Sequence, residues 1–153
     1  MLFTQCINHK GLVGLAASWL KRRRPSNQIN CTEVFTELVT MNNTGEIPDV
    51  IGFNYWTSVV VEVKTSRADF LRDRKKPFRQ EPIKGMGEFR YYCVLKGLVK
   101  KEELPNGWGL LEYDSGELVC SLLPERMKSN AVEERILLLS ALRRLKSRSA
   151  KLR

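Results

Sequence analysis

The chain has 153 residues, of which 42% are hydrophobic and 28% charged, so it holds enough apolar content for one globular domain with a buried core. Lys and Arg number 26 against 17 Asp and Glu, which gives a net charge of +9. This excess of positive charge favours a polyanionic partner, either nucleic acid or an acidic membrane surface. It argues against an acidic, purely solvating chain.

The cysteines and the early apolar run indicate the cellular compartment. Four dispersed cysteines without a Cys-x-x-Cys spacing, and a single histidine, His9, argue against a zinc site. Reduced thiols in an intracellular, cytoplasmic protein are therefore expected in place of a disulfide framework. The run Gly11–Leu20 is too short to span a bilayer, and basic residues follow it, so we expect neither a signal peptide nor a membrane span.

Apolar residues recur at helical spacing from Leu12 to Leu20 and predict a first helix. Pro25-Ser26-Asn27 is expected to stop it. The basic run Lys21–Arg24 either touches phosphates or forms a solvated helix end. His9, just before the helix, is expected to be a loop or capping residue and not a ligand.

Three segments rich in β-branched and aromatic residues follow, and each predicts a strand: Cys31–Thr40, Pro48–Phe53 and Ser58–Lys64. The last two, joined by Asn54–Thr57, are expected to form a hairpin. In the third strand Val59, Val61 and Val63 share one face.

Charged residues mark one end of that hairpin. Glu62 and Lys64 are two residues apart in a strand, so their side chains point the same way. Asp49 begins the preceding strand, and the hairpin brings it near the same end. These charges form either a functional cluster or a solvated contact of little energetic value. Glu37, on the first strand, either reaches the same cluster or is solvated.

A short helix is expected after Lys64, because Ser66 and Asp69 form a capping box and Pro77 follows. Basic residues on its exposed side and in the loop after it either gather phosphate oxygens beside the carboxylates or make the surface soluble. These residues are Arg67, Arg72, Lys75 and Lys76 on the helix side, and Arg79 and Lys84 in the loop.

The next segments alternate between loops and strands. Residues 85–87 are two glycines around a methionine, and this sequence predicts a flexible hinge. The alternating residues 88–95 predict a strand, parallel to Ser58–Lys64 because a helix separates the two. Residues 98–104 predict a helical turn. Residues 108–113 and 117–122 predict a hairpin around Asp114-Ser115-Gly116.

Asn130 and Glu133 are expected to cap a long final helix, with acids early and bases late. From Arg143 onward the chain has basic residues and no acid, so a frayed end available for electrostatic contact is expected. The expected apolar face of the helix carries Val132, Ile136, Leu139 and Leu142.

This order of elements, with Pro48-Asp49 before one strand and Glu62-Val63-Lys64 in the next, resembles the PD-(D/E)XK nuclease superfamily. The run from Glu62 to Lys75, the Phe89–Val94 strand and the Gly107–Tyr113 hairpin are similar to its MmcB-like DNA-repair branch. The resemblance extends from Cys31 to Val119. It implies an α/β fold with a restriction-endonuclease-like core, a mixed central sheet flanked by helices, in a single domain over residues 1–153 with a basic C-terminal helix over residues 130–153.

The resemblance also implies a metal site. In that superfamily the motif acids bind Mg²⁺ or Mn²⁺, which implies Asp49 and Glu62 as catalytic metal ligands, with the carbonyl of Val63 and the side chain of Glu37 as further ligands. Hard divalent cations do prefer such oxygen donors. Lys64 is implied to orient or deprotonate the attacking water, and a desolvated lysine beside a metal is expected to titrate below its usual pKa.

The expected function is metal-dependent hydrolysis of DNA phosphodiester bonds, in DNA repair, recombination or the processing of phage or mobile-element DNA. The resemblance further implies a homodimer where both strands are cut. Two alternatives stay open. One is a DNA-binding adaptor that keeps the nuclease fold without cleaving, and the other is a structural protein whose basic C-terminal helix docks an acidic partner.

Overall fold

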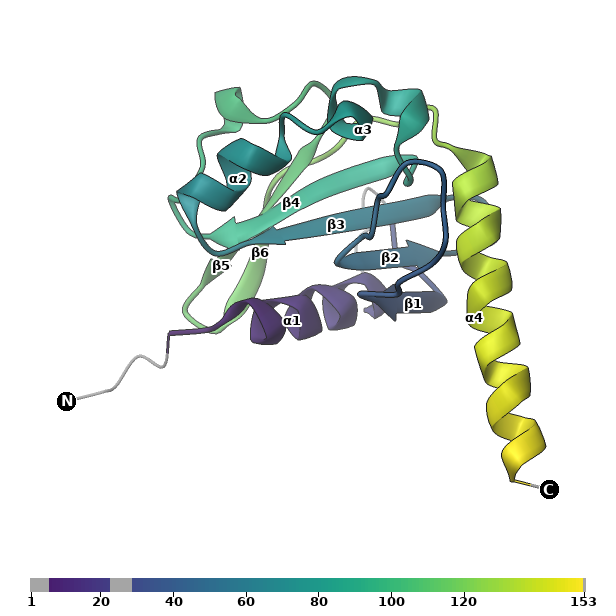
Figure 1. Cartoon of the computed structure of the whole chain (residues 1–153). Helices are drawn as coiled ribbons and strands as arrows, with labels where there is room; N and C mark the ends of the chain where they lie inside the picture. The colour runs from purple at the N-terminus through teal and green to yellow at the C-terminus, as the bar shows by residue number, and fades with distance from the viewer. Residues whose placement is uncertain (1–5, 23–28, 153) are drawn as a thin grey trace.

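The computed structural model describes residues 6–22 and 29–152 and contains a six-stranded mixed sheet flanked by helices (Figure 1). Strand order follows the chain, from β1 to β6. The pairs β3–β4 and β4–β5 are parallel, and the other three are antiparallel. The α/β class with a mixed central sheet is therefore confirmed.

The elements have the following bounds. The strands are β1 (Glu33–Thr36), β2 (Val50–Phe53), β3 (Ser58–Lys64), β4 (Phe89–Leu95), β5 (Gly109–Asp114) and β6 (Glu117–Leu122). The helices are α1 (His9–Lys21), α2 (Arg67–Asp73), α3 (Pro77–Gln80) and α4 (Ala131–Lys151), with 3₁₀ turns η1 (Pro82–Lys84) and η2 (Lys101–Glu103).

Helix α1 covers one face of the sheet. Its apolar residues, Leu12 to Leu20, pack against Val59, Val61 and Val63 of β3, as the alternation of that strand predicts. The Asn8 side chain caps the helix by accepting a hydrogen bond from Gly11 N at 2.8 Å. His9 is thus the first residue of the helix, so the expectation of a loop or capping residue is wrong. The expected stop at residues 25–27 lies outside the described residues.

The other face is covered by α2, α3 and the first half of α4. Phe70 of α2 packs on Tyr92, and Tyr92 stacks on Trp108 with ring centroids 4.6 Å apart. Further along the sheet, Leu137 of α4 packs with Val60 and Met86. The second face therefore has one apolar cluster at each end. The polar side chains of β3 lie on the same face, beside these clusters.

The crossover from β3 to β4 forms as predicted. The Ser66 hydroxyl caps α2 by accepting a hydrogen bond from Asp69 N at 3.2 Å. Strand β4 then returns parallel to β3, with Val61 beside Tyr91. The predicted hairpins β2–β3 and β5–β6 are also present.

Two predictions about local structure are wrong. Strand β1 is shorter than residues 31–40, because Glu37 adopts a left-handed backbone with a φ of 46°. The segment 85–87 is packed and not a free hinge, since Met86 is fully buried and Gly87, at a φ of 86°, lies against Val60.

Helix α4 also differs from its prediction. Asn130 caps it through Glu133 N as expected, but the buried residues are Glu133, Leu137 and Ala141. The helix continues to Lys151, so its end is not frayed within the described residues. Of the face expected to be apolar and packed, Ile136 is half-buried while Val132, Leu139 and Leu142 are exposed.

Two further predictions concern the cysteines and membrane-spanning helices. Cys31 and Cys93 are buried in the core, and the four cysteines form no disulfide in the described part of the chain. Among residues 6–22 and 29–152, no helix has both the length and the apolarity needed to cross a bilayer.

Candidate functional site

The candidate site lies where the start of β2 meets the end of β3. These strands are antiparallel with Val50 opposite Val61, so Asp49, one residue before β2, lies at the level of Glu62, near the end of β3. The Asp49 Oδ2 atom accepts a hydrogen bond from Val63 N at 2.8 Å. The Asp49 carboxylate therefore accepts from a backbone N–H that lies beyond the last β2–β3 residue pair. This hydrogen bond fixes the carboxylate at the end of the sheet.

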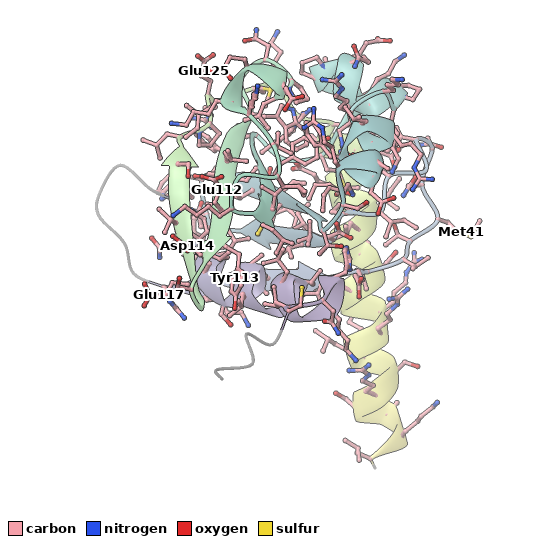
Figure 2. The ribbon with its side chains drawn as sticks, turned by 90° about the vertical axis from the view of Figure 1, so that its left-hand side faces the viewer. Met41, Glu112, Tyr113, Asp114, Glu117 and Glu125 are labelled. Carbon is pink, nitrogen blue, oxygen red and sulfur yellow. The ribbon has the colours of Figure 1, made fainter. Side chains whose placement is uncertain are left out.

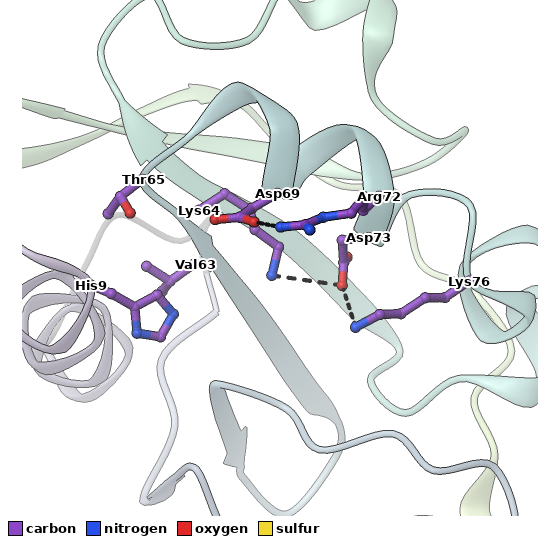
Figure 3. Close-up of a pocket in the computed structure, with 8 residues that line it drawn as sticks. All are labelled: His9, Val63, Lys64, Thr65, Asp69, Arg72, Asp73 and Lys76. Atoms are coloured by element: carbon purple, nitrogen blue, oxygen red, sulfur yellow. Dashed lines mark hydrogen bonds and ion pairs between the residues drawn. The ribbon is translucent and has the colours of Figure 1, made fainter.

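Lys64 brings the predicted residues together. Its Nζ atom lies 2.6 Å from Glu62 Oε1 and 3.9 Å from Asp49 Oδ2. Asp73 of α2 adds a third carboxylate, with its Oδ1 atom 3.6 Å from the same nitrogen (Figure 3). The side chains of Asp49, Glu62 and Lys64 therefore converge, as the strand period and the hairpin predict.

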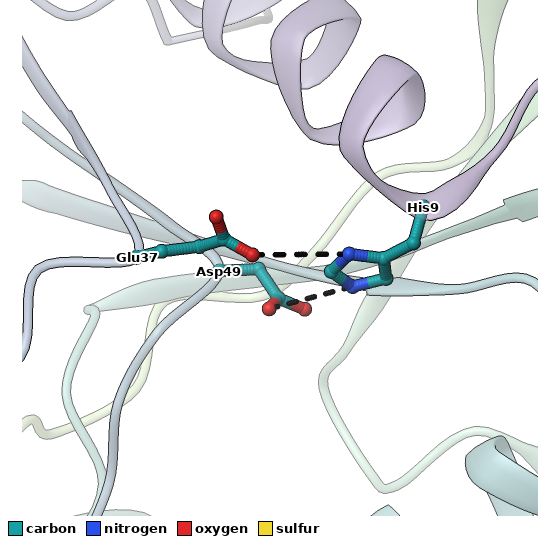
Figure 4. A group of neighbouring side chains, drawn as sticks. All are labelled: His9, Glu37 and Asp49. Carbon is teal, nitrogen blue, oxygen red and sulfur yellow. Dashed lines mark ion pairs between the residues drawn. The ribbon is translucent and has the colours of Figure 1, made fainter.

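His9 approaches Asp49 from α1 (Figure 4). Its Nε2 atom lies 3.5 Å from Asp49 Oδ1, and its Nδ1 atom lies 3.8 Å from Glu37 Oε1. The left-handed backbone of Glu37 is held by a bond from its own N to the Asp49 carbonyl at 2.9 Å. Glu37 thus reaches the Asp49 side of the cluster. Sequence reasoning missed His9 as a site residue. Its place directly before the first apolar run could have indicated that it lies at the end of that helix, over the sheet.

A buried arginine holds the inner side of the cluster. The Arg79 guanidinium contacts Glu46 Oε1 at 2.7 Å, Asp73 Oδ2 at 2.9 Å and Glu62 Oε2 at 3.0 Å. The residue is only 3% exposed. The prediction that Arg79 is a loop residue contacting nucleic acid is therefore wrong. Pro77 starts the short helix α3, and this helix turns Arg79 inward, over the Trp108 ring at 5.1 Å.

Two of the carboxylates around Arg79 have further partners. Asp73 accepts a hydrogen bond from the Tyr92 hydroxyl at 2.6 Å, and Lys76 lies 2.9 Å from its other oxygen. Glu46 accepts a hydrogen bond from Met86 N at 2.8 Å. Sequence reasoning missed both Glu46 and Asp73, since each lies in a segment that looks polar and solvated.

Burial and charge shift the pKa values of these groups in different directions. Burial raises the pKa of Glu62 to about 7, against the opposing effect of Arg79 and Lys64. Burial also acts to raise the pKa of Asp73, but Arg79 and Lys64 outweigh it and the pKa falls below its usual value. The two acids therefore differ in their charge near neutral pH: Asp73 is ionised and Glu62 is partly protonated.

The carboxylates around Lys64 raise its pKa. Burial acts to lower this pKa, but the charges of Glu62 and Asp73 outweigh burial and raise it. Lys64 is thus a stable ammonium group among the carboxylates.

A pocket of about 350 Å³ opens beside the cluster. Lys64 and Asp73 form its inner wall, and Arg72 and Lys76 stand at its rim (Figure 3). The lining residues are His9, Val63, Lys64, Thr65, Asp69, Arg72, Asp73 and Lys76.

The other predicted nucleic-acid contacts lie away from this rim. Arg67 pairs with Glu103 of η2. Lys84, placed in η1 and not in a loop, pairs with Glu81 at 2.7 Å. Lys75 is exposed and lies in the short turn that follows α2.

The residues present fit a hard divalent cation. His9, Glu37 and Asp49 each offer one ligand atom, and these atoms lie within 4.8 Å of one another. Carboxylate oxygens suit Mg²⁺ and Mn²⁺, while the imidazole nitrogen is better suited to Mn²⁺. Glu62 lies deeper, with its two oxygens facing Lys64 and Arg79.

The comparisons with known proteins bear on the fold. No family model and no curated protein matches the chain. Among solved structures, a protein of unknown function from Silicibacter pomeroyi is similar, with a TM-score of 0.53 and 25% sequence identity. The match covers 74% of this chain and 77% of that one.

Proposed function

We propose that the chain is a metal-dependent nuclease of PD-(D/E)XK type that hydrolyses DNA phosphodiester bonds. One observation carries the proposal: Asp49, Glu62 and Lys64 come from two facing strand ends and meet within 3.9 Å of the lysine nitrogen. His9 and Glu37 add donors on the open side of Asp49.

The proposed roles follow from the position of each side chain. Asp49 holds Mg²⁺ or Mn²⁺, joined by His9 and Glu37 on the open side and by Glu62 and the Val63 carbonyl on the sheet side. The bound cation would supply a water of lowered pKa and neutralise charge on a phosphoryl oxygen. The Lys64 ammonium orients the nucleophilic water and stabilises the negative charge that develops on the phosphoryl group.

The charge around the pocket favours one direction of approach for DNA. Arg72 and Lys76 at the rim can contact phosphates. The β5–β6 side of the molecule carries Glu112, Asp114 and Glu117, which would repel a polyanion (Figure 2). We therefore propose that DNA approaches over α2, and that the enzyme acts inside the cell in DNA repair, recombination or the processing of mobile DNA.

The test is cleavage of single-stranded, duplex and branched DNA in Mn²⁺ or Mg²⁺. The variants are Asp49→Asn and Lys64→Met, and Asp114→Asn on the β5–β6 hairpin is the matched control. We expect the two site variants to lose at least about 100-fold in rate, as removal of one charged stabilising group does elsewhere, and the control to keep its rate. If wild type cleaves no faster than both site variants on every substrate, the enzyme proposal is wrong.

A second candidate is the non-cleaving adaptor, and the pairing of both Glu62 oxygens with Lys64 and Arg79 favours it. An adaptor would bind DNA with a strong salt dependence and without a saturable Mn²⁺ site. Asp49→Asn would then leave DNA affinity unchanged, and wild type would show no metal-stimulated cleavage.

A further inference from the structure

Helix α4 consists of two parts with different surroundings. Its first part is held by Leu137, which packs with Val60 and Met86, and by Glu133, which accepts hydrogen bonds from Asn43. Beyond Ala141 every described residue is exposed, and the helix projects past the sheet (Figures 1 and 2). Arg144 in this second part donates a hydrogen bond to the Val39 carbonyl. The packing of the fold therefore does not account for the apolar side chains on this second part.

The exposed leucines of α4 follow a heptad pattern. Leu138, Leu142 and Leu145 are 40%, 47% and 58% exposed and stand four and three residues apart. Leu152, 88% exposed, continues the pattern one heptad after Leu145. Spacings of four and three place side chains in one narrow stripe along a helix, as at the a and d positions of a coiled coil. We name these four leucines the α4 seam.

The α4 seam begins beside an exposed aromatic residue. Trp56, in the β2–β3 turn, is 83% exposed. It lines a pocket of about 280 Å³ together with Arg135 and Leu138 of α4. Polar residues, among them Glu88 and Glu134, also line this pocket. Exposed tryptophan and arginine are typical anchors of a protein interface.

Charge complementarity indicates the kind of partner. The second part of α4 carries Arg143, Arg144, Lys146, Arg148 and Lys151, of which Lys146 and Arg148 occupy the e and g positions that flank the α4 seam, and no acid occurs after Glu134. A second copy would place basic residues against basic residues in either orientation, which is unfavourable. An acidic helix would instead pair with these flanks.

The composition of α4 argues against a lipid surface. Helices that lie on membranes present Trp and Phe together with Leu, whereas the exposed large apolar residues of α4 are leucines and Val132, and the helix contains no aromatic residue. We propose that the α4 seam and Trp56 form a docking surface for an acidic amphipathic helix of a partner protein. The proposal does not depend on the nuclease proposal, since none of these residues lines the pocket beside Lys64.

The test uses a synthetic helical peptide of four heptads with Leu at a and d and Glu at e and g. A matched peptide carries Lys at e and g. Binding to the full chain is measured by fluorescence anisotropy. The variant is Leu142→Ala with Leu145→Ala, and the control is Val119→Ala, which removes an equally exposed apolar residue on β6. We expect the Glu peptide to bind wild type and the control equally, and the leucine variant and the Lys peptide to give at least tenfold weaker binding.

Three results would overturn the proposal. One is equal binding of the Glu peptide to wild type and the leucine variant. Another is concentration-dependent dimerisation in sedimentation that the leucine variant abolishes, because a second copy would then cover the α4 seam. The third is loss of binding to phosphatidylglycerol vesicles in that variant, without any binding of the Glu peptide. Circular dichroism checks that the variant, changed only at exposed positions, keeps its helix content.

Discussion

Arg79 is the residue on which the buried half of the site depends. One guanidinium faces the carboxylates of Glu46, Glu62 and Asp73, almost without contact with solvent. Three acids buried side by side would repel one another and lose their hydration without such a partner. Arg79 therefore makes the burial of Glu62 beside Lys64 possible.

We predict that Arg79→Met destabilises the fold by about 3–5 kcal/mol, because it leaves buried carboxylates without their main cation. Urea unfolding measures this change. Arg72→Ala is the matched control, since Arg72 forms an exposed ion pair with Asp69 and its loss should cost less than about 1 kcal/mol. Equal stability of Arg79→Met and wild type would contradict the assigned network.

Glu62 gives a prediction about pH. Its pKa rises from 4.5 to about 7 on folding, so the folded state holds this proton more tightly than the unfolded state. The stability from Glu62 is complete below pH 4.5 and is lost as the pH rises through about 7. We expect the unfolding free energy of Glu62→Gln, relative to wild type, to increase between about pH 5 and pH 8. Urea unfolding across this range tests it, and a constant or falling difference would be contrary to the raised pKa.

The convergence of Asp49, Glu62 and Lys64 could be predicted from sequence because it needs only the two-residue period of a strand and one hairpin. The inward positions of Asp73 and Arg79 could not. Each lies in a short helix with many charged neighbours, and which of those charges turns inward depends on how α2 and α3 pack on Tyr92 and Trp108.

At the scale of elements, Gly87 shows why the segment after η1 is packed. Its φ of 86° is left-handed, and a Cβ there would lie 2.8 Å from a Val60 methyl and 3.0 Å from Val60 N. The β3–β4 crossover therefore closes through a backbone contact that a side chain would block.

We predict that Gly87→Ala destabilises more than Gly116→Ala, by about 1–3 kcal/mol. Both glycines have left-handed φ angles, so both variants bear a similar backbone cost. Only Gly87 meets a close neighbour, whereas a Cβ at Gly116 has open space. Thermal or urea unfolding compares the two, and equal losses would exclude the Val60 contact as the cause.

Helix α4 illustrates what periodicity can and cannot predict about an element. The Asn130 cap and the long apolar pattern correctly predicted a helix and its start. The packed face was predicted wrongly, because leucines recur on more than one side of α4 and the leucine that packs with the sheet residues Ile51 and Val60 is Leu137. The α4 seam is a second apolar stripe, and periodicity alone does not distinguish it from the face that packs on the core.

For the whole molecule, the class of fold and the pairings β2–β3, β3–β4 and β5–β6 could be predicted from the sequence, because hairpins and one short crossover helix leave few arrangements open. The pairings β1–β2 and β4–β5, and hence the full strand order, were not predicted. The distribution of charge could not be predicted either. The net charge of +9 predicted a polyanionic partner, but it could not show that Arg72 and Lys76 stand at the pocket while Arg67 and Lys84 lie away from it, nor that each of the four pairs with an acid. That division depends on tertiary structure.

The central claim is that Asp49 and its neighbours hold a divalent cation, and a crystal structure of the protein soaked in Mn²⁺ tests it most directly. We predict an anomalous peak about 2.0–2.2 Å from an Asp49 carboxylate oxygen, close to His9 and absent in Asp49→Asn. A peak only at the acidic β5–β6 hairpin, or none beside Asp49 at millimolar Mn²⁺, would contradict the account.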